Sequence, residues 1–212
     1  DAYLKTVCTG LYYDNPGGVG YVNISTSAIS PRIIRTGQQD PYGLYIRGSA
    51  IANLMVEGGW CALSMFSGET STVTNIYTFP GSKTYIGPGV TATNAKHSGG
   101  ELIFEAAQTL TLLQVDAGIV TTNGSGAITT QNIYGGRLVS NQTGTVTTSN
   151  VYSGTVDYTK SQVARTVTTQ TEYPTSKVFV SSGTGTGAVT FTTRTRIGVA
   201  TTAGGGDPSQ DS

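Results

Sequence analysis

Charged side chains are scarce in this chain of 212 residues, which has 12 basic and 12 acidic residues. They make up 11% of the chain, against roughly 25% in ordinary soluble domains. The sequence has no basic run, the electrostatic mark of nucleic-acid-binding proteins, so we expect no nucleic-acid partner. No stretch approaches the roughly 20 apolar residues of a membrane helix, so we expect no membrane partner either. A weakly charged surface with zero net charge favours association, and we therefore expect a homo-oligomer.

Cysteine and histidine are almost absent. The two cysteines, Cys8 and Cys61, are too few for a disulfide framework. We interpret them as small buried apolar side chains, with a bond between them as the alternative. His97 is the single histidine, and no other histidine or cysteine lies near it in the repeat described below. We therefore expect a core histidine, and neither a metal site nor a cofactor.

Helical periodicity is also missing, whereas threonine (36 residues) and glycine (29 residues) are abundant. Threonine is β-branched and suits the pleated surface of a strand. This composition predicts a fold that is nearly all β-structure.

An 18-residue repeat is clearest over residues 109–162, as TLTLLQVDAGIVTTNGSG, AITTQNIYGGRLVSNQTG and TVTTSNVYSGTVDYTKSQ. Apolar residues occupy positions 2, 7 and 12 of each repeat, which in the middle one are Ile128, Ile133 and Leu138. Residues five apart point to opposite faces of a straight strand, so the chain must turn for all three to face one core. Position 10 is glycine, here Gly136, which suits such a corner. The pattern predicts a parallel β-solenoid (β-helix) with about 18 residues and three short strands per coil, paired at an offset of 18.

The repeat extends, with insertions, over residues 28–197. At its start the frame places Ile34 at position 7 of the coil. An end coil exposes unpaired strand edges, so we expect residues 1–27 to form an N-terminal cap or docking segment. Residues 198–212 are typical of a flexible tail.

Two outward rows are candidate contact sites. Position 8 predicts an aromatic ladder and position 6 a polar ladder beside it. The aromatic ladder either stiffens the sheet or offers a flat contact strip to a partner subunit or to sugar rings. Trp60 is a candidate interface anchor on another coil. The candidate interface residues are Tyr134, Tyr152, Tyr173, Asn132, Asn150 and Trp60.

The carboxylates do not predict an active site. The repeat region offers Glu101, Glu105, Asp116, Asp157 and Glu172. On one strand face, Glu101 and Glu105 would lie about 13 Å apart at roughly 3.3 Å per residue. Catalytic carboxylates of glycosidases are about 5–9.5 Å apart. We interpret all five as solvated surface charges, assign no catalytic residue, and expect that the protein is not an enzyme.

The repeats AITTQNIYGGRLVSNQTG and TVTTSNVYSGTVDYTKSQ resemble the β-solenoid proteins of bacteriophage particles: capsid decoration proteins, head fibres and tail-spike shafts. This resemblance implies a non-enzymatic structural protein on the virion surface, a trimer that contacts capsid or other particle proteins. The stretches YGGRLV and EGGWCAL are similar, more weakly, to the passenger repeats of autotransporter adhesins. That resemblance implies an adhesin or glycan-binding protein outside the cell or on a bacterial surface. A polysaccharide-degrading enzyme is the third interpretation.

Overall fold

The computed structural model describes residues 10–14, 20–24, 30–35, 43–48, 50–105, 109–160, 163–181 and 188–198. Cys8 and all but the first residue of the predicted tail lie outside these ranges. Cys61 is buried and its thiol is free, as the interpretation of a small core side chain requires.

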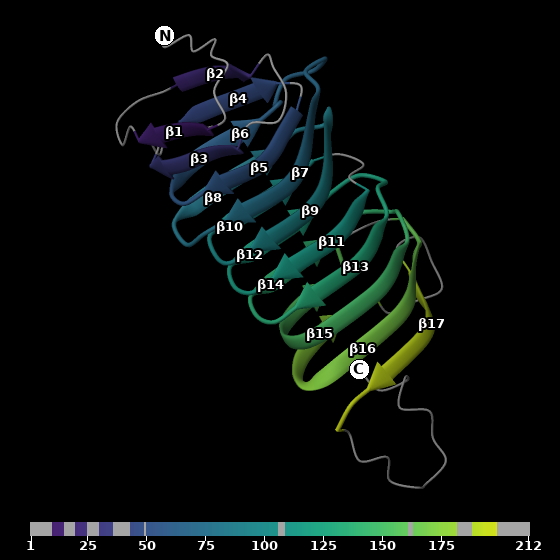
Figure 1. The fold of residues 1–212 in the computed structure, drawn as a ribbon. Helices are drawn as coiled ribbons and strands as arrows, with labels where there is room; N and C mark the ends of the chain where they lie inside the picture. Colours follow the sequence, from purple (N-terminus) through teal and green to yellow (C-terminus); the bar gives the residue numbers. More distant parts are fainter. Residues whose placement is uncertain are drawn as a thin grey trace, which may run out of the picture.

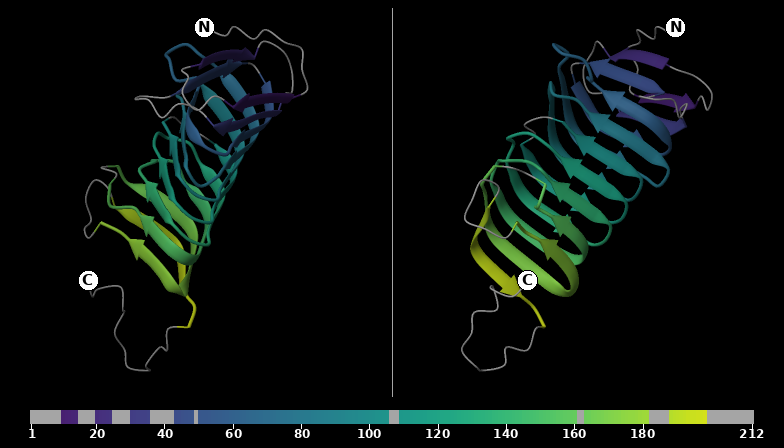
Figure 2. Two further views of the ribbon diagram at one scale, coloured as in Figure 1. Left: turned by 90° about the vertical axis from the view of Figure 1, so that its left-hand side faces the viewer. Right: turned by 180° about the vertical axis from the view of Figure 1, so that it is seen from behind.

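The chain folds as a parallel β-solenoid, and the described residues contain no helix (Figure 1). Seventeen strands form one continuous sheet in which every pairing is parallel. This confirms the predicted fold class. Figure 2 shows from two further sides how the coils stack along one axis.

The strands alternate along the chain between two ladders. The long-strand ladder consists of β1 (Gly10–Asp14), β3 (Ser30–Arg35), β5 (Ala50–Val56), β7 (Ser71–Thr78), β9 (Val90–His97), β11 (Leu110–Val115), β13 (Ile128–Ile133), β15 (Val146–Asp157), β16 (Arg165–Phe179) and β17 (Val189–Arg196). The short-strand ladder consists of β2 (Gly20–Ile24), β4 (Leu44–Gly48), β6 (Gly59–Leu63), β8 (Ser82–Ile86), β10 (Glu101–Phe104), β12 (Ile119–Thr122) and β14 (Arg137–Ser140). It continues in the C-terminal parts of β15 and β16, which pair with β14 and with each other.

The predicted pairing offset of 18 is confirmed. Every pairing among strands β8 to β15 joins residues 18 apart, as in Ile133 with Val151. Val115, Ile133 and Val151 are fully buried and stacked in register, as expected. Toward the ends, insertions change the offset, for example to 24 between Gly20 and Leu44.

Most coils contain two strands where three were predicted, because the first two predicted strands are joined into one long strand. The first predicted corner lies inside the long strand. Ile128 pairs with Val146 and Thr130 with Thr148, and the residue between, Thr129, is skipped. Thr129 and Thr130 both point away from the core between the buried Ile128 and Gln131, so the strand turns a corner there without a change of register.

The turn between the long and the short strand is built on glycine in the coils of the central repeat. Gly136 has a φ of 69°, a value at which glycine carries no steric penalty. A Cβ atom on Gly136 would lie 2.5 Å from the carbonyl oxygen of Gly118 on the preceding coil. Position 10 is therefore glycine for its conformation and for close packing of the coils.

The N-terminal strands belong to the same ladders as the rest of the chain. Strands β1 and β2 lie in the range 1–27 for which a cap or docking segment was predicted, and they pair in parallel with β3 and β4. The prediction that Ile34 occupies position 7 is wrong, because Ile33 is the fully buried residue that pairs with Val56. Two adjacent isoleucines leave the register open by one residue in the sequence.

One row of the interior changes from apolar to polar along the axis. One inward row runs in register through Leu54, Ile76, Ala95, Leu113, Gln131, Ser149 and Gln170, all of them buried. Gln131 Nε2 donates to Ser149 Oγ at 2.7 Å and to the hydroxyl of the fully buried Tyr158 at 2.8 Å. This row is therefore apolar in the first coils, whereas in the later coils Gln131 and Ser149 add an internal hydrogen bond to it.

Candidate functional site

The three predicted tyrosines form a stacked aromatic ladder on the outside of the solenoid. The ring centroids of Tyr134 and Tyr152 are 4.6 Å apart with nearly parallel planes, and those of Tyr152 and Tyr173 are 4.7 Å apart. The ladder register sets this stack, because the Tyr134 amide donates to the Val115 carbonyl at 2.8 Å, one coil earlier. Since neighbouring rings cover one another, a ligand meets mainly their edges and the two outer faces. Tyr134, at one end of the stack, is 46% exposed.

The asparagine ladder beside the tyrosines is also formed. Asn150 Nδ2 donates to Asn132 Oδ1 at 3.0 Å, and a side-chain amide can both donate and accept along such a row. We call the surface made by Tyr134, Tyr152, Tyr173, Asn132 and Asn150 the Tyr–Asn strip.

A second asparagine ladder was missed in the sequence. Asn75 Nδ2 donates to Asn53 Oδ1 at 2.9 Å, and Asn94 Nδ2 donates to Asn75 Oδ1 at 3.0 Å. These residues are 22 and 19 apart. Identical residues at roughly the coil spacing were the available signal, but the insertions between coils hide it from an 18-residue frame.

Trp60 does not join the Tyr–Asn strip. It lies in β6, on the short-strand ladder, whereas the tyrosines lie in or directly after long strands. The ammonium group of Lys83 is 4.7 Å from the Trp60 ring centroid, and Lys83 also approaches Glu101 at 3.7 Å.

Two of the five carboxylates are buried, and the prediction that they are solvated is wrong. Asp157 is 4% exposed and accepts hydrogen bonds from Arg137 at 2.5 Å and from the Thr159 amide and hydroxyl at 3.0 and 2.6 Å. Desolvation raises the pKa of Asp157, but the hydrogen bonds from Thr159 and Arg137 outweigh it and hold the pKa below its usual value.

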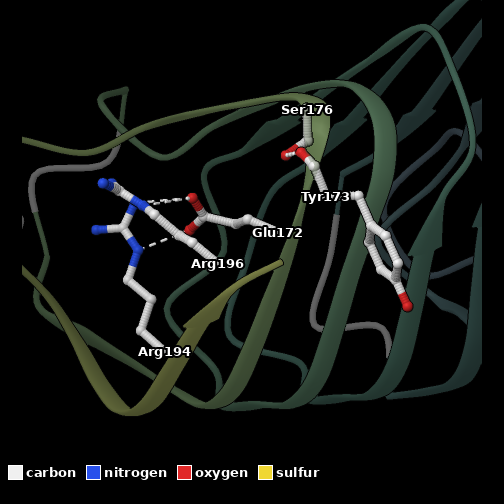
Figure 3. A network of polar contacts seen from close by, with 5 residues as sticks. All are labelled: Glu172, Tyr173, Ser176, Arg194 and Arg196. Atoms are coloured by element: carbon white, nitrogen blue, oxygen red, sulfur yellow. Dashed lines mark hydrogen bonds and ion pairs between the residues drawn. The ribbon is translucent and has the colours of Figure 1, made fainter. Parts of the chain in front are cut away.

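Glu172 is the other buried carboxylate, at 7% exposed, and it joins two arginines of β17 (Figure 3). Arg194 donates to both of its oxygens, at 2.6 and 3.3 Å, and Arg196 Nε donates at 3.2 Å. The ring of Tyr173 points away from this cluster. The cluster links β16 and β17 by charge, beside the apolar contacts that Val189 and Phe191 of β17 make with the core.

The remaining three carboxylates have different partners. Glu101 faces Lys83, Glu105 accepts from Asn123 at 3.0 Å, and Asp116 accepts from Gln114 at 2.7 Å. Within the described ranges, no three His, Cys, Asp or Glu side chains are grouped so that they could hold a metal ion.

His97 is a core residue, as predicted. It is fully buried, and its Nδ1 lies 2.6 Å from Thr78 Oγ1. Burial lowers the pKa of His97 to about 4, so the ring is neutral at pH 7.

Comparisons with known proteins add no assignment: no family model, no curated protein and no solved structure matches this chain. In the part of the chain that the structure describes, no helix is long and apolar enough to cross a membrane.

Proposed function

We propose that this chain is a non-enzymatic structural protein on the exterior of a virus particle. There it decorates or cements the capsid, or forms a fibre, through contacts with other subunits. The observation that carries the proposal is the Tyr–Asn strip, an outward stack of tyrosine rings over three coils with an asparagine pair beside the first two.

The stiffness of the body supports a mechanical role. Parallel strands join each coil to the next from β1 to β17, and a coil cannot open without breaking bonds on both ladders. Side-chain ladders add further links between coils, as in the tyrosine stack and the pair Asn132–Asn150. Such a body holds its outward side chains at fixed positions, as a contact strip needs.

The weak surface charge supports association. The net charge is zero, and a domain with that charge is poorly protected from contact with other proteins. Tyrosine is enriched in protein interfaces because it combines a large apolar ring with a polar hydroxyl. We assign the Tyr–Asn strip to contact with a neighbouring subunit or a capsid protein.

Immunogold labelling of particles released from the source organism tests this proposal. An antibody raised against the folded chain should decorate the outside of intact particles, with free chain as the competitor that removes the label. Label on cell envelopes, with bare particles, would overturn the virion assignment and favour an adhesin on the cell surface.

A specific hollow favours glycan binding as the second candidate function. It has a volume of about 240 Å³ on the outer face of β7, β9 and β11, and it is lined by Asn75, Ile76, Tyr77, Asn94, Ala95, Lys96, Leu112 and Gln114. An aromatic ring, side-chain amides and an ammonium group suit the apolar face and hydroxyl rim of a sugar ring.

Glycan-array screening of the chain beside the variants Tyr77→Ala and Tyr134→Ala tests this candidate. Binding in the hollow should be lost at least tenfold in Tyr77→Ala and kept in Tyr134→Ala. Absence of binding by the unaltered chain to any immobilised glycan would refute the glycan-binding candidate.

A further inference from the structure

The outer face of the short-strand ladder carries exposed apolar side chains. In β10, β12 and β14 the fully buried residues Leu102, Val120 and Leu138 alternate with outward ones. Ile119 faces outward and is 46% exposed, and Ile103 and Val139 face outward and are half-buried. We call the surface of Ile103, Ile119 and Val139 the Ile–Val strip.

The long-strand ladder shows that strand formation does not require these residues. Over the same coils its outward residues are mainly threonine and asparagine, such as Thr129, Thr147 and Asn150, with Leu112 and Tyr152 as exceptions. Threonine is β-branched like valine and isoleucine, and is similarly suited to a strand. The outward isoleucines and valine therefore indicate a surface that another molecule covers.

The ladder register places the three side chains in two adjacent rows of one outward face, where Ile119 pairs with Glu101 and Arg137. Ile103 pairs with Thr121 and Thr121 with Val139, so two of them lie in one row with a threonine between. Ile119 lies in the adjacent outward row of the same sheet, two residues before Thr121. In Figure 1 the strands β10, β12 and β14 follow one another along the body, so the strip runs parallel to the solenoid axis.

We propose that the Ile–Val strip is the interface through which two copies of this chain associate side by side. The charges near the strip are paired within the chain, Lys83 with Glu101 at 3.7 Å and Arg137 with Asp157 at 2.5 Å. A strip whose neighbouring charges are already paired is complementary to a neutral partner, and the same strip on a second copy is one.

The axial spacing of the outward rows also favours a second copy of the chain as the partner. Outward rows on this face recur once per coil, at roughly 4.8 Å, the spacing of neighbouring strands. A partner with the same axial repeat can place its rows between these rows along the whole length. Another copy of the chain has that repeat.

The face is large enough for such a contact. The short-strand ladder has eight rungs from β4 to the C-terminal part of β16. At about 4.8 Å between rungs and 3.3 Å per residue, four residues wide, it covers roughly 440 Å² in projection. Two copies together cover about 900 Å² in projection, and side-chain relief brings the accessible area to about the 1,000 Å² of a specific interface.

This inference rests on the proposed function only in that both require assembly. It assigns self-association to the Ile–Val strip and leaves the Tyr–Asn strip to a capsid or other particle protein.

The test compares three variants by size-exclusion chromatography with light scattering. The strip variant is Ile103→Lys with Ile119→Lys. The matched control is Thr111→Lys with Thr129→Lys on the outward face of the long strands, and the third variant is Tyr134→Ser, Tyr152→Ser and Tyr173→Ser. At micromolar concentration the unaltered chain, the control and the tyrosine variant should each have the mass of at least two chains of 22.0 kDa. The strip variant should have the mass of one chain and keep its far-ultraviolet circular dichroism.

A milder pair keeps the test decisive if the lysine variant does not fold. Ile103→Thr with Ile119→Thr retains β-branched side chains and should raise the dissociation constant of the assembly at least tenfold. An unaltered chain that is monomeric at 100 µM, about a hundredfold above micromolar, or a strip variant that keeps its mass, would overturn the inference. Dissociation of the tyrosine variant alone would place self-association on the Tyr–Asn strip instead. Neither result would affect the immunogold test of the virion role.

Discussion

Replacing Gly136 with alanine should weaken the solenoid more than the same change at Gly81. Both glycines lie in a turn between a long and a short strand, with φ of 69° and 85°. Forcing an L-residue into this region costs roughly 1–2 kcal/mol at either site. A Cβ at Gly81 would meet no atom within 4 Å, whereas at Gly136 it would lie 2.5 Å from the Gly118 carbonyl oxygen.

The additional cost at Gly136 comes from the ladder. Real Cβ contacts are essentially never under 3.0 Å, so the 2.5 Å contact must open by about half an ångström. The same carbonyl of Gly118 accepts the amide of Arg137 at 2.8 Å. Opening the coils by that amount stretches this bond beyond about 3.2 Å, the limit of a good N–H···O bond. Loss of one ladder bond costs about 1 kcal/mol, so we expect about 2–3 kcal/mol in total at Gly136.

Urea unfolding followed by circular dichroism measures both variants. The free energy of unfolding should fall by about 1–2 kcal/mol for Gly81→Ala, from the conformational cost alone. Equal losses at the two sites, or a larger one at Gly81, would refute the reasoning that the coils approach too closely for a side chain at Gly136.

The other predictions concern the core and its charged groups. Ile133→Ala should cost about 2–5 kcal/mol of unfolding free energy, because it removes a fully buried side chain. The outward Thr129→Ala should stay within about 0.5 kcal/mol in the same urea titration, and equal losses would contradict the assigned faces. His97 has a pKa of about 4 in the fold against 6.5 as its ordinary value, so the unfolded chain binds the proton more tightly between these values. The contribution of the neutral His97 ring to the free energy of unfolding is complete above pH 6.5 and is lost as pH falls toward 4, about 3 kcal/mol in all. The variant His97→Gln should therefore reduce the pH dependence of the unfolding free energy over this window. Glu172→Gln should cost about 1–3 kcal/mol, below the 3–5 of a fully buried pair because Arg196 is partly exposed. Arg196→Gln should cost less, and an equal or larger loss there would show that the buried carboxylate is not the centre of the cluster.

The sequence predicts the middle of this fold well because residues 109–162 contain no insertion. Over this range, residues that pair on neighbouring coils are 18 apart in the sequence. The 18-residue frame therefore predicts the burial of Ile133 and the stacking of Tyr134 on Tyr152. Where insertions occur, the 18-residue frame no longer identifies the paired residues. The ladder of Asn53, Asn75 and Asn94 needs the true register of each coil before it becomes visible.

The buried polar groups were not predictable from the repeat. Gln131 and Ser149 occupy an inward row, but polar residues in a strand normally indicate its solvent face. Glu172 was interpreted as a surface charge because its partner Arg194 lies 22 residues later, on a coil whose pairing with β16 has an offset of 24. Burial of a carboxylate depends on such a distant partner, which an 18-residue frame does not identify.

The change from apolar to polar side chains along one inward row favours folding that starts in the earlier coils. Coils that bury Leu54, Ile76 and Leu113 gain stability from desolvation and can form a compact seed early. Gln131 and Ser149 gain little from leaving water until the neighbouring coil supplies a hydrogen-bond partner for each. On a ribosome the earlier coils are synthesised first. Each later coil can then pair with strands that are already folded. The order in which the coils are encoded thus matches the order in which they can fold.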